Sequence, residues 1–177
     1  MTDAPAIPAV RLWTPDGFRA DEWVHAEDAA LSGSNARLIL PLAAWSSLDA
    51  AARFAARDRL GVLLQPGEAI DAIVPHLDEL ALVALAFPAF SDGRSFSKAQ
   101  LLRGRHGYRG PLRAVGQILV DQLPHMLRLG FDQFEVTHPV LIARLEKGQV
   151  GGLPLHYQPA IGEEPKAGGY TWRRMTA

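Results

Sequence analysis

The side chains best suited to chemistry in this sequence follow an apolar run. Residues 80–87 are apolar without alternation, a pattern typical of a strand buried on both faces. Asp92, Arg94 and Ser97 come directly after this run. Because ligands of open parallel sheets bind outside the carboxyl ends of the strands, these side chains lie on the expected functional edge. An Asp-Gly turn followed by a serine helix cap accounts for the same residues without a ligand, and both interpretations stay open.

The segment from Ser91 to Val120 is basic, although the whole chain has a formal net charge of −1. It contains one acidic residue against six basic ones, a local charge of about +5. The six are Arg94, Lys98, Arg103, Arg105, Arg109 and Arg113. Guanidinium groups bind carboxylate, sulfate and phosphate through paired hydrogen bonds, so the segment suits a small anion or an acidic protein surface. A solvated helix face would have the same composition. If the segment binds an anion, Arg94 and Arg113 are the best placed to do so, because each lies at or beside a predicted strand.

A second polar group follows the next predicted strand, residues 112–116. Gln117, Asp121 and Gln122 lie there, and they share the carboxyl edge if the strands are parallel. Asp121 favours the positive end of its helix, and it is also a candidate to hold Arg94 or Arg113 in place, since a buried arginine needs a carboxylate partner. We favour this pairing over catalysis. If the protein is an enzyme, Asp92 and Asp121 are its candidate bases, with Arg94, Ser97, Arg113, Gln117 and Gln122 as anion-binding residues.

Several chemistries are excluded or unsupported. The chain has no cysteine, so disulfides, thiolate metal sites and iron–sulfur clusters are ruled out. Its six histidines lack the helical spacing of metal ligands, and no metal site is expected. Glycine-rich phosphate loops and the nucleophile motif Gly-x-Ser-x-Gly do not occur, and there is no haem or flavin signature, so any cofactor stays unknown.

The same sequence features limit the cell compartment and the partners. The near-neutral charge indicates no nucleic acid, and no apolar run reaches the roughly 20 residues of a membrane helix. The N-terminus has no basic end and no apolar core of signal-peptide length. A cytoplasmic protein is therefore expected.

Alternating strands and helices make up the predicted core, residues 36–147. The predicted strands are 37–40, 62–64, 80–87, 112–116 and 134–136, and the predicted helices are 46–59, 69–77, 96–106, 118–129 and 139–147. This alternation predicts an α/β domain with a mainly parallel sheet. Five units are too few for a closed eightfold barrel, so a doubly wound three-layer sheet is preferred over a barrel fragment.

Two segments outside this core lack a clear period. Residues 1–35 are predicted to form an N-terminal arm, in which residues 13–18 make a turn between short strands or pack on the body. Residues 148–177 are rich in glycine and proline and contain aromatic and basic residues, which predicts an irregular C-terminal arm. Both arms are candidates for homo-oligomer contacts. Inside the core, Pro124 predicts that helix 118–129 either kinks or starts after it.

The most distinctive block of residues resembles a known family. The block comprises Phe87-Pro88-x-Phe90-x-Asp92-Gly93-Arg94, Gly107-Tyr108-Arg109-Gly110-x-Leu112-Arg113-Ala114-Val115-Gly116 and Asp121-Gln122. It is similar to the bacterial family called domain of unknown function 934, and the likeness extends over roughly residues 38–136. Members are usually encoded beside sulfite reductase and phosphoadenylylsulfate reductase and are often labelled oxidoreductases. The resemblance thus implies a role in sulfite reduction and cysteine biosynthesis.

Three functions follow as hypotheses. The first is an accessory protein of assimilatory sulfate and sulfite reduction, which binds a sulfur oxyanion or docks sulfite reductase or its electron carrier through the arginine-rich edge. The second is an enzyme acting on a small anionic substrate, an oxidoreductase by resemblance only, with Arg94 as the anion clamp. The third is a structural module that oligomerises through its arms. The absence of cysteine weighs against a stand-alone reductase.

Overall fold

The computed structural model describes residues 10–28 and 35–152. They form one sheet whose strands lie in the order β2-β1-β8-β7-β6-β5-β4-β3. The strands are β1 Arg11–Thr14, β2 Gly17–Arg19, β3 Trp23–His25, β4 Arg37–Pro41, β5 Leu60–Leu64, β6 Leu82–Phe87, β7 Leu112–Gly116 and β8 Gln133–Val136. The predicted strands of the core are all confirmed, because each is a segment rich in apolar residues and too short for a helix.

Helices occupy most connections between the parallel strands, and a last helix follows β8. The helices are α1 Leu42–Ser47, α2 Ala50–Ala55, α3 Arg94–Gln100, α4 Leu123–Arg128 and α5 Pro139–Glu146. A π-helical turn, Leu101–Arg105, continues α3, and two 3-10 segments, Ile70–Ala72 and Val74–Glu79, lie between β5 and β6. None of the helices within the described ranges is long and apolar enough to cross a bilayer.

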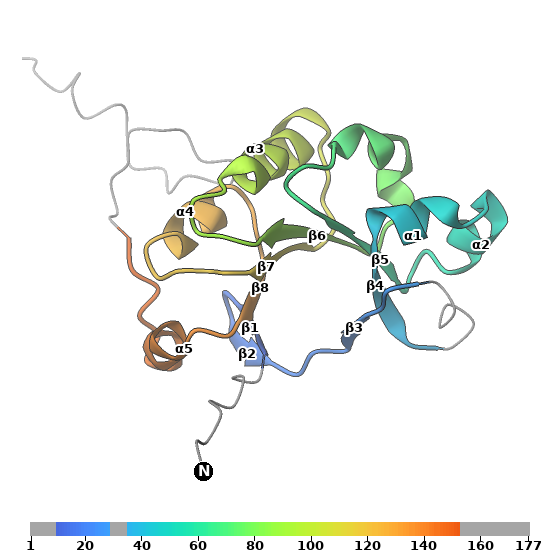
Figure 1. Ribbon diagram of the computed structural model, residues 1–177. Helices are drawn as coiled ribbons and strands as arrows, with labels where there is room; N and C mark the ends of the chain where they lie inside the picture. Colours follow the sequence, from blue (N-terminus) through green and yellow to red (C-terminus); the bar gives the residue numbers. More distant parts are fainter. Residues whose placement is uncertain (1–9, 29–34, 153–177) are drawn as a thin grey trace, which may run out of the picture.

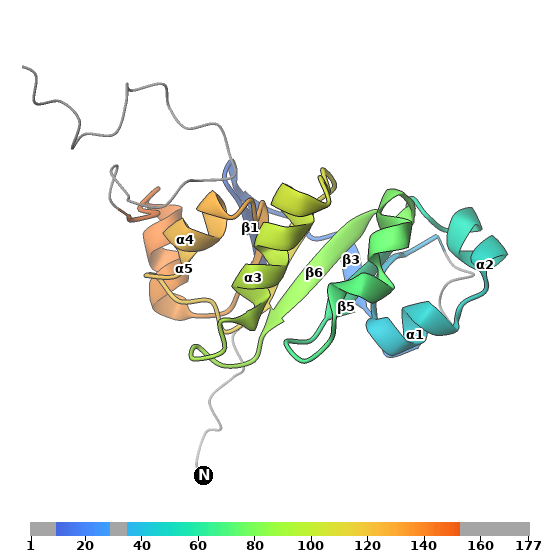
Figure 2. The same ribbon diagram turned by 90° about the horizontal axis from the view of Figure 1, so that it is seen from above.

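The sheet curls into a half-barrel, so the predicted doubly wound sheet is not confirmed. Strands β3 to β8 are parallel and stand side by side in chain order, without the reversal that defines a doubly wound sheet. Right-handed crossovers between strands in this order place their helices on the same face. Figure 1 shows α1, α2, α3 and α4 along the outer face of the curved sheet, and Figure 2 shows the same helices from above. The barrel-fragment alternative therefore describes the fold better.

Residues 11–25, assigned from the sequence to an arm, supply three strands of this sheet. β1 and β2 form a hairpin around Pro15 and Asp16, which confirms the predicted turn between short strands. β1 also pairs antiparallel with β8, and Trp13 packs on Phe134 with ring centroids 5.5 Å apart. The β2–β3 connection then runs across the open side of the half-barrel to β3, which pairs with β4 (Figure 1). The N-terminal residues thereby link the two ends of the sheet.

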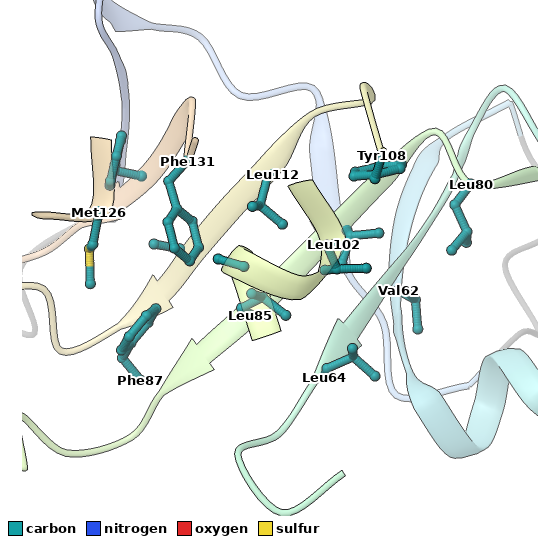
Figure 3. Packing of buried hydrophobic residues seen from close by; sticks show 14 of the residues in the cluster. Val62, Leu64, Leu80, Leu85, Phe87, Leu102, Tyr108, Leu112, Met126 and Phe131 are labelled. Carbon is teal, nitrogen blue, oxygen red and sulfur yellow. The ribbon is translucent and has the colours of Figure 1, made fainter. Parts of the chain in front are cut away.

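Side chains alternate between the two faces of the sheet. In β6, Val83, Leu85 and Phe87 face the helices and join the main core, whereas Leu82 and Ala84 face the concave side. Figure 3 shows Leu85 and Phe87 packed with Leu102, Leu112 and Phe131 beneath the helices. This explains why the 80–87 run is apolar at every position, since both faces of its strand are covered.

Three predicted helices differ from those observed. The range predicted as a helix over 46–59 contains only the end of α1 and the whole of α2. Asp49 rather than Ser46 or Ser47 caps α2, accepting a hydrogen bond from the Ala52 amide at 2.7 Å. The helix predicted over 69–77 is 3-10 in character. The helix predicted over 118–129 spans only α4, with Pro124 in the first turn, where its missing amide hydrogen has no intrahelical role.

Candidate functional site

The loop after β6 is anchored to the sheet by buried contacts. The Ser95 hydroxyl donates to the Ala86 carbonyl at 2.6 Å, and the Phe96 ring packs on Phe87 with centroids 5.0 Å apart. On the other side the Gln117 amide donates to the Phe87 carbonyl at 2.7 Å. Gly116 makes this approach feasible, because its φ is +104° and an added Cβ would lie 2.5 Å from the Phe87 oxygen. The edge that carries Asp92 and Arg94 therefore starts from a rigid base.

Asp92 and Arg94 form a bidentate ion pair on this edge. Arg94 Nε donates to Oδ1 at 2.9 Å, Nη2 donates to Oδ2 at 2.6 Å, and the Arg94 amide also donates to Oδ1 at 3.2 Å. The hydrogen bond from Arg94 lowers the pKa of Asp92 to about 2. A carboxylate whose pKa lies so far below neutral pH is a weak general base. The geometry thus argues against Asp92 as a catalytic base and leaves Arg94, whose side chain is 63% exposed, as the accessible cation.

Lys98 lies beside this pair and is buried, with only 8% of the residue exposed. The interpretation of Lys98 as part of a solvated helix face is therefore wrong. Its ammonium group donates to the Gln65 carbonyl in the loop after β5. Burial lowers the pKa of Lys98, and the carboxylate of Glu68 partly offsets that effect. Lys98 stands one helical turn after Arg94, and this spacing was the signal available in the sequence.

The loop after β5 completes the edge. Glu68 folds back so that its Oε2 accepts a hydrogen bond from the Gln65 amide at 2.6 Å. Gly67 faces Arg94, since an added Cβ would lie 4.0 Å from Nη1. We call Gln65, Glu68, Asp92, Arg94 and Lys98 the β5–β6 edge cluster. Two cations and two carboxylates from the carboxyl ends of neighbouring strands meet there.

Arg113 lies elsewhere, on the concave face of the sheet, and is fully buried. Nη1 and Nη2 donate to the two carboxylate oxygens of Asp21 at 2.8 and 3.0 Å. Nε and Nη2 donate to Gln133 Oε1 at 3.0 and 2.8 Å, and Nη1 donates to Glu135 Oε1 at 3.1 Å. The alternative that Asp121 holds Arg94 or Arg113 is wrong, because Asp92 pairs with Arg94 while Asp21 and Glu135 pair with Arg113.

The concave network also contains residues that sequence reasoning missed. His25 Nε2 lies 2.8 Å from Glu135 Oε1, and it donates because a carboxylate only accepts. His25 comes from β3 and Glu135 from β8, near opposite ends of the sheet order. The alternation in β8 placed Gln133 and Glu135 on one strand face and was a usable signal. Nothing in the sequence pointed to Asp21 or His25. Because every donor of Arg113 faces these residues, this network is a tie across the half-barrel rather than a free anion clamp.

The remaining predicted residues have separate surroundings. Ser97 is exposed on α3. Gln122 uses both ends of its amide structurally: Nε2 donates to the Phe90 carbonyl at 3.0 Å, and Oε1 accepts from the Leu119 amide at 3.3 Å. Gln117 lines a cavity of about 290 Å³ together with Phe87 and Glu135. Asp121 lines a different cavity of about 440 Å³ between α4 and α5.

No set of three or more potential metal ligands occurs in residues 10–28 and 35–152. The charged hydrogen-bond donors of the β5–β6 edge cluster are the Arg94 guanidinium and the Lys98 ammonium, each with a carboxylate nearby. Such groups bind and orient anions through charge-assisted hydrogen bonds.

The fold and its edge thus define a small α/β half-barrel protein with a paired arginine and a buried lysine at the carboxyl ends of two strands. Its family follows from the sequence comparison. The family model described as bacterial protein of unknown function (DUF934) matches residues 61–167, so the chain belongs to that family and the suspected resemblance is confirmed. No curated protein matches the chain. The matched residues include the loops after β5 and β6, and hence the whole β5–β6 edge cluster.

Proposed function

We propose that this protein is a cytoplasmic accessory protein of assimilatory sulfate and sulfite reduction that binds a sulfur oxyanion at the β5–β6 edge cluster. The observation that carries the proposal is the buried Lys98 ammonium beside the Arg94 guanidinium. Two cations at close quarters repel each other unless negative charge lies between or beside them. Asp92 and Glu68 supply that charge in the unliganded protein, and an oxyanion with three or four acceptor oxygens can take over their role.

The hydrogen-bond inventory leaves donors for such a ligand. Arg94 commits Nε and Nη2 to Asp92, and its Nη1 has no acceptor among the described residues. The Lys98 ammonium has three hydrogens, and among the described residues its one hydrogen-bond acceptor is the Gln65 carbonyl. Because Asp92 and Glu68 already balance the two cations, an oxyanion competes with carboxylates for them. We therefore expect modest affinity that falls as salt concentration rises.

The burial of Lys98 favours a small anion over a protein surface as the primary ligand. An acidic partner such as sulfite reductase or its electron carrier can reach the exposed Arg94, but not an ammonium group in a residue that is 8% exposed. We infer that docking of such a partner, if it occurs, follows anion binding. The homo-oligomer contacts proposed for the two arms, residues 1–35 and 148–177, stay a proposal, and residues 1–9, 29–34 and 153–177 of these arms lie outside the described residues.

Calorimetric titration of the full chain with sulfite and with sulfate at low ionic strength tests the proposal. Arg94→Gln and Lys98→Met should each weaken binding at least about tenfold, the loss expected for one charge-assisted hydrogen bond. Arg109→Gln is the matched control, because it removes an exposed arginine of the same basic segment. Absence of saturable binding to either anion, or equal losses in the Arg109 variant, would contradict the proposal.

The pathway is tested separately in a deletion strain. Growth should fail on sulfate and on sulfite and should be restored by cysteine. Complementation with wild type should restore growth, whereas the Arg94→Gln variant should not. Normal growth of the deletion strain on sulfate would remove the sulfite assignment even if the protein binds anions.

A further inference from the structure

The cavity between α4 and α5 has no role in the function proposed above. Its volume is about 440 Å³, which lies in the range of small-molecule sites. Its charged and polar lining residues are Asp121, His125, Arg128 and Arg144, and its apolar lining includes Val120 and Pro124. It shares no residue with the β5–β6 edge cluster. Among the described residues, the lining therefore combines two guanidinium groups with a single carboxylate.

The two arginines lack acidic partners among the described residues. Neither Arg128 nor Arg144 forms a salt bridge within the described ranges, whereas Arg11, Arg94, Arg103 and Arg113 all do. The Nε of Arg144 is buried and has no hydrogen-bond acceptor there. A buried donor without an acceptor is unfavourable, so an arginine in this position is typical of a place where a ligand supplies the acceptor.

His125 adds a further donor to the cavity. Its Nδ1 lies 3.2 Å from Arg128 Nη2, and since a guanidinium only donates, Nδ1 accepts and the hydrogen of the neutral ring is on Nε2. Burial, together with the charge of Arg128, lowers the pKa of His125 and keeps the ring neutral. The Phe96 ring, 4.9 Å away between centroids, holds the imidazole in place. Asp121 is the only acceptor side chain among the charged residues of the lining.

We propose that the α4–α5 cavity binds a small organic molecule through a phosphate or sulfate ester group. Arg128 and Arg144 hold the ester oxygens, because guanidinium groups match tetrahedral oxyanions through two parallel hydrogen bonds. Val120 and Pro124 contact the apolar part of the molecule. The volume exceeds the needs of a bare inorganic ion, so the organic part contributes to affinity.

Phenyl phosphate is a suitable probe, because it joins a dianionic ester to an apolar ring. Calorimetry on the full chain should show that phenyl phosphate binds more tightly than inorganic phosphate, and that phenol does not bind. Arg128→Gln and Arg144→Gln should each weaken phenyl phosphate binding at least about tenfold. Phenyl sulfate, tested in parallel, identifies which of the two esters is preferred.

Two further variants make the test decisive. Asp121→Asn should strengthen binding, because it removes a negative charge from the lining, and such a gain cannot arise from misfolding. Arg109→Gln should leave phenyl phosphate binding unchanged, because Arg109 is an exposed arginine outside the cavity lining. Equal binding by wild type and both cavity variants, or equal losses in the Arg109 variant, would overturn the proposal.

Discussion

Arg94 and Arg113 each hold a carboxylate through two parallel hydrogen bonds, yet their surroundings are opposite. The Arg94 side chain is 63% exposed, and its partner Asp92 is two residues away. Arg113 is fully buried, and its partners Asp21 and Glu135 are 92 and 22 residues away. An exposed pair keeps hydrogen-bond capacity for a ligand, whereas a buried pair uses all its donors to connect distant strands. The degree of burial, rather than the residue type, thus separates a candidate binding group from a structural one.

If burial determines the difference, Arg113→Met should have the largest effect on stability. It leaves Asp21 and Glu135 without their cation, and removing one partner of a buried pair costs about 3–5 kcal/mol. Urea unfolding monitored by circular dichroism measures the loss. The matched variant Arg94→Met should cost about 1 kcal/mol or less, because exposed ion pairs contribute little. Equal losses of unfolding free energy in the two variants would contradict the idea that burial separates the two arginines.

The close contact between β6 and β7 gives the next largest effect. Gly116→Ala forces a Cβ to within 2.5 Å of the Phe87 oxygen at a φ of +104°. Gly17→Ala is a matched control, because Gly17 has a φ of +112° but open space around it. Backbone strain alone costs on the order of 1–3 kcal/mol, so Gly116→Ala should exceed Gly17→Ala in urea unfolding. Indistinguishable urea midpoints for the two variants would show that the Phe87 carbonyl moves away from the added Cβ.

The pKa of Asp92 sharpens the description of the exposed pair. Its folded value of about 2 lies below the ordinary value of 3.8, so ionised Asp92 stabilises the fold above pH 3.8 and this contribution is lost as the pH falls toward 2. A carboxyl-carbon NMR titration should show a midpoint near 2 in wild type. In Arg94→Gln the midpoint should move toward the ordinary value, since Arg94 is the principal cause. An unchanged midpoint in that variant would assign the shift to another group.

Lys98 has the smallest expected effect, and its charged form destabilises the fold, whereas the charged form of Asp92 stabilises it. Burial lowers its folded pKa below the ordinary 10.5, so the unfolded chain binds more protons between these two values. Stability therefore rises as the pH increases through this window. The unfolding free energy of wild type minus that of Lys98→Met should accordingly increase from pH 8 to pH 10. A pH-independent difference would mean that the ammonium is hydrated.

The local sequence was sufficient to predict the strands of the core and one part of the candidate site. Residues 80–87 are an apolar run that only a covered strand explains, and residues 112–116 are a short segment whose one charged residue is Arg113. Their parallel pairing follows from the helix between them. Asp92 and Arg94 are neighbours in the chain, so their meeting required no knowledge of the fold. The same reasoning failed for Lys98, because helix spacing does not indicate whether another loop will cover that face.

The sequence by itself therefore determined the strands of the core, the parallel α/β class and the Asp92–Arg94 pair, since all three depend on residues close in the chain. Only the tertiary structure decided the half-barrel, because the pairing of β1 with β8 and of β3 with β4 joins segments without a strong local pattern. It also decided the roles of Lys98 and Arg113. The loop after β5 buries Lys98, and Asp21 in the β2–β3 connection neutralises Arg113 on the concave face. Burial and long-range charge pairing are properties of the folded chain, so no local residue pattern predicts them.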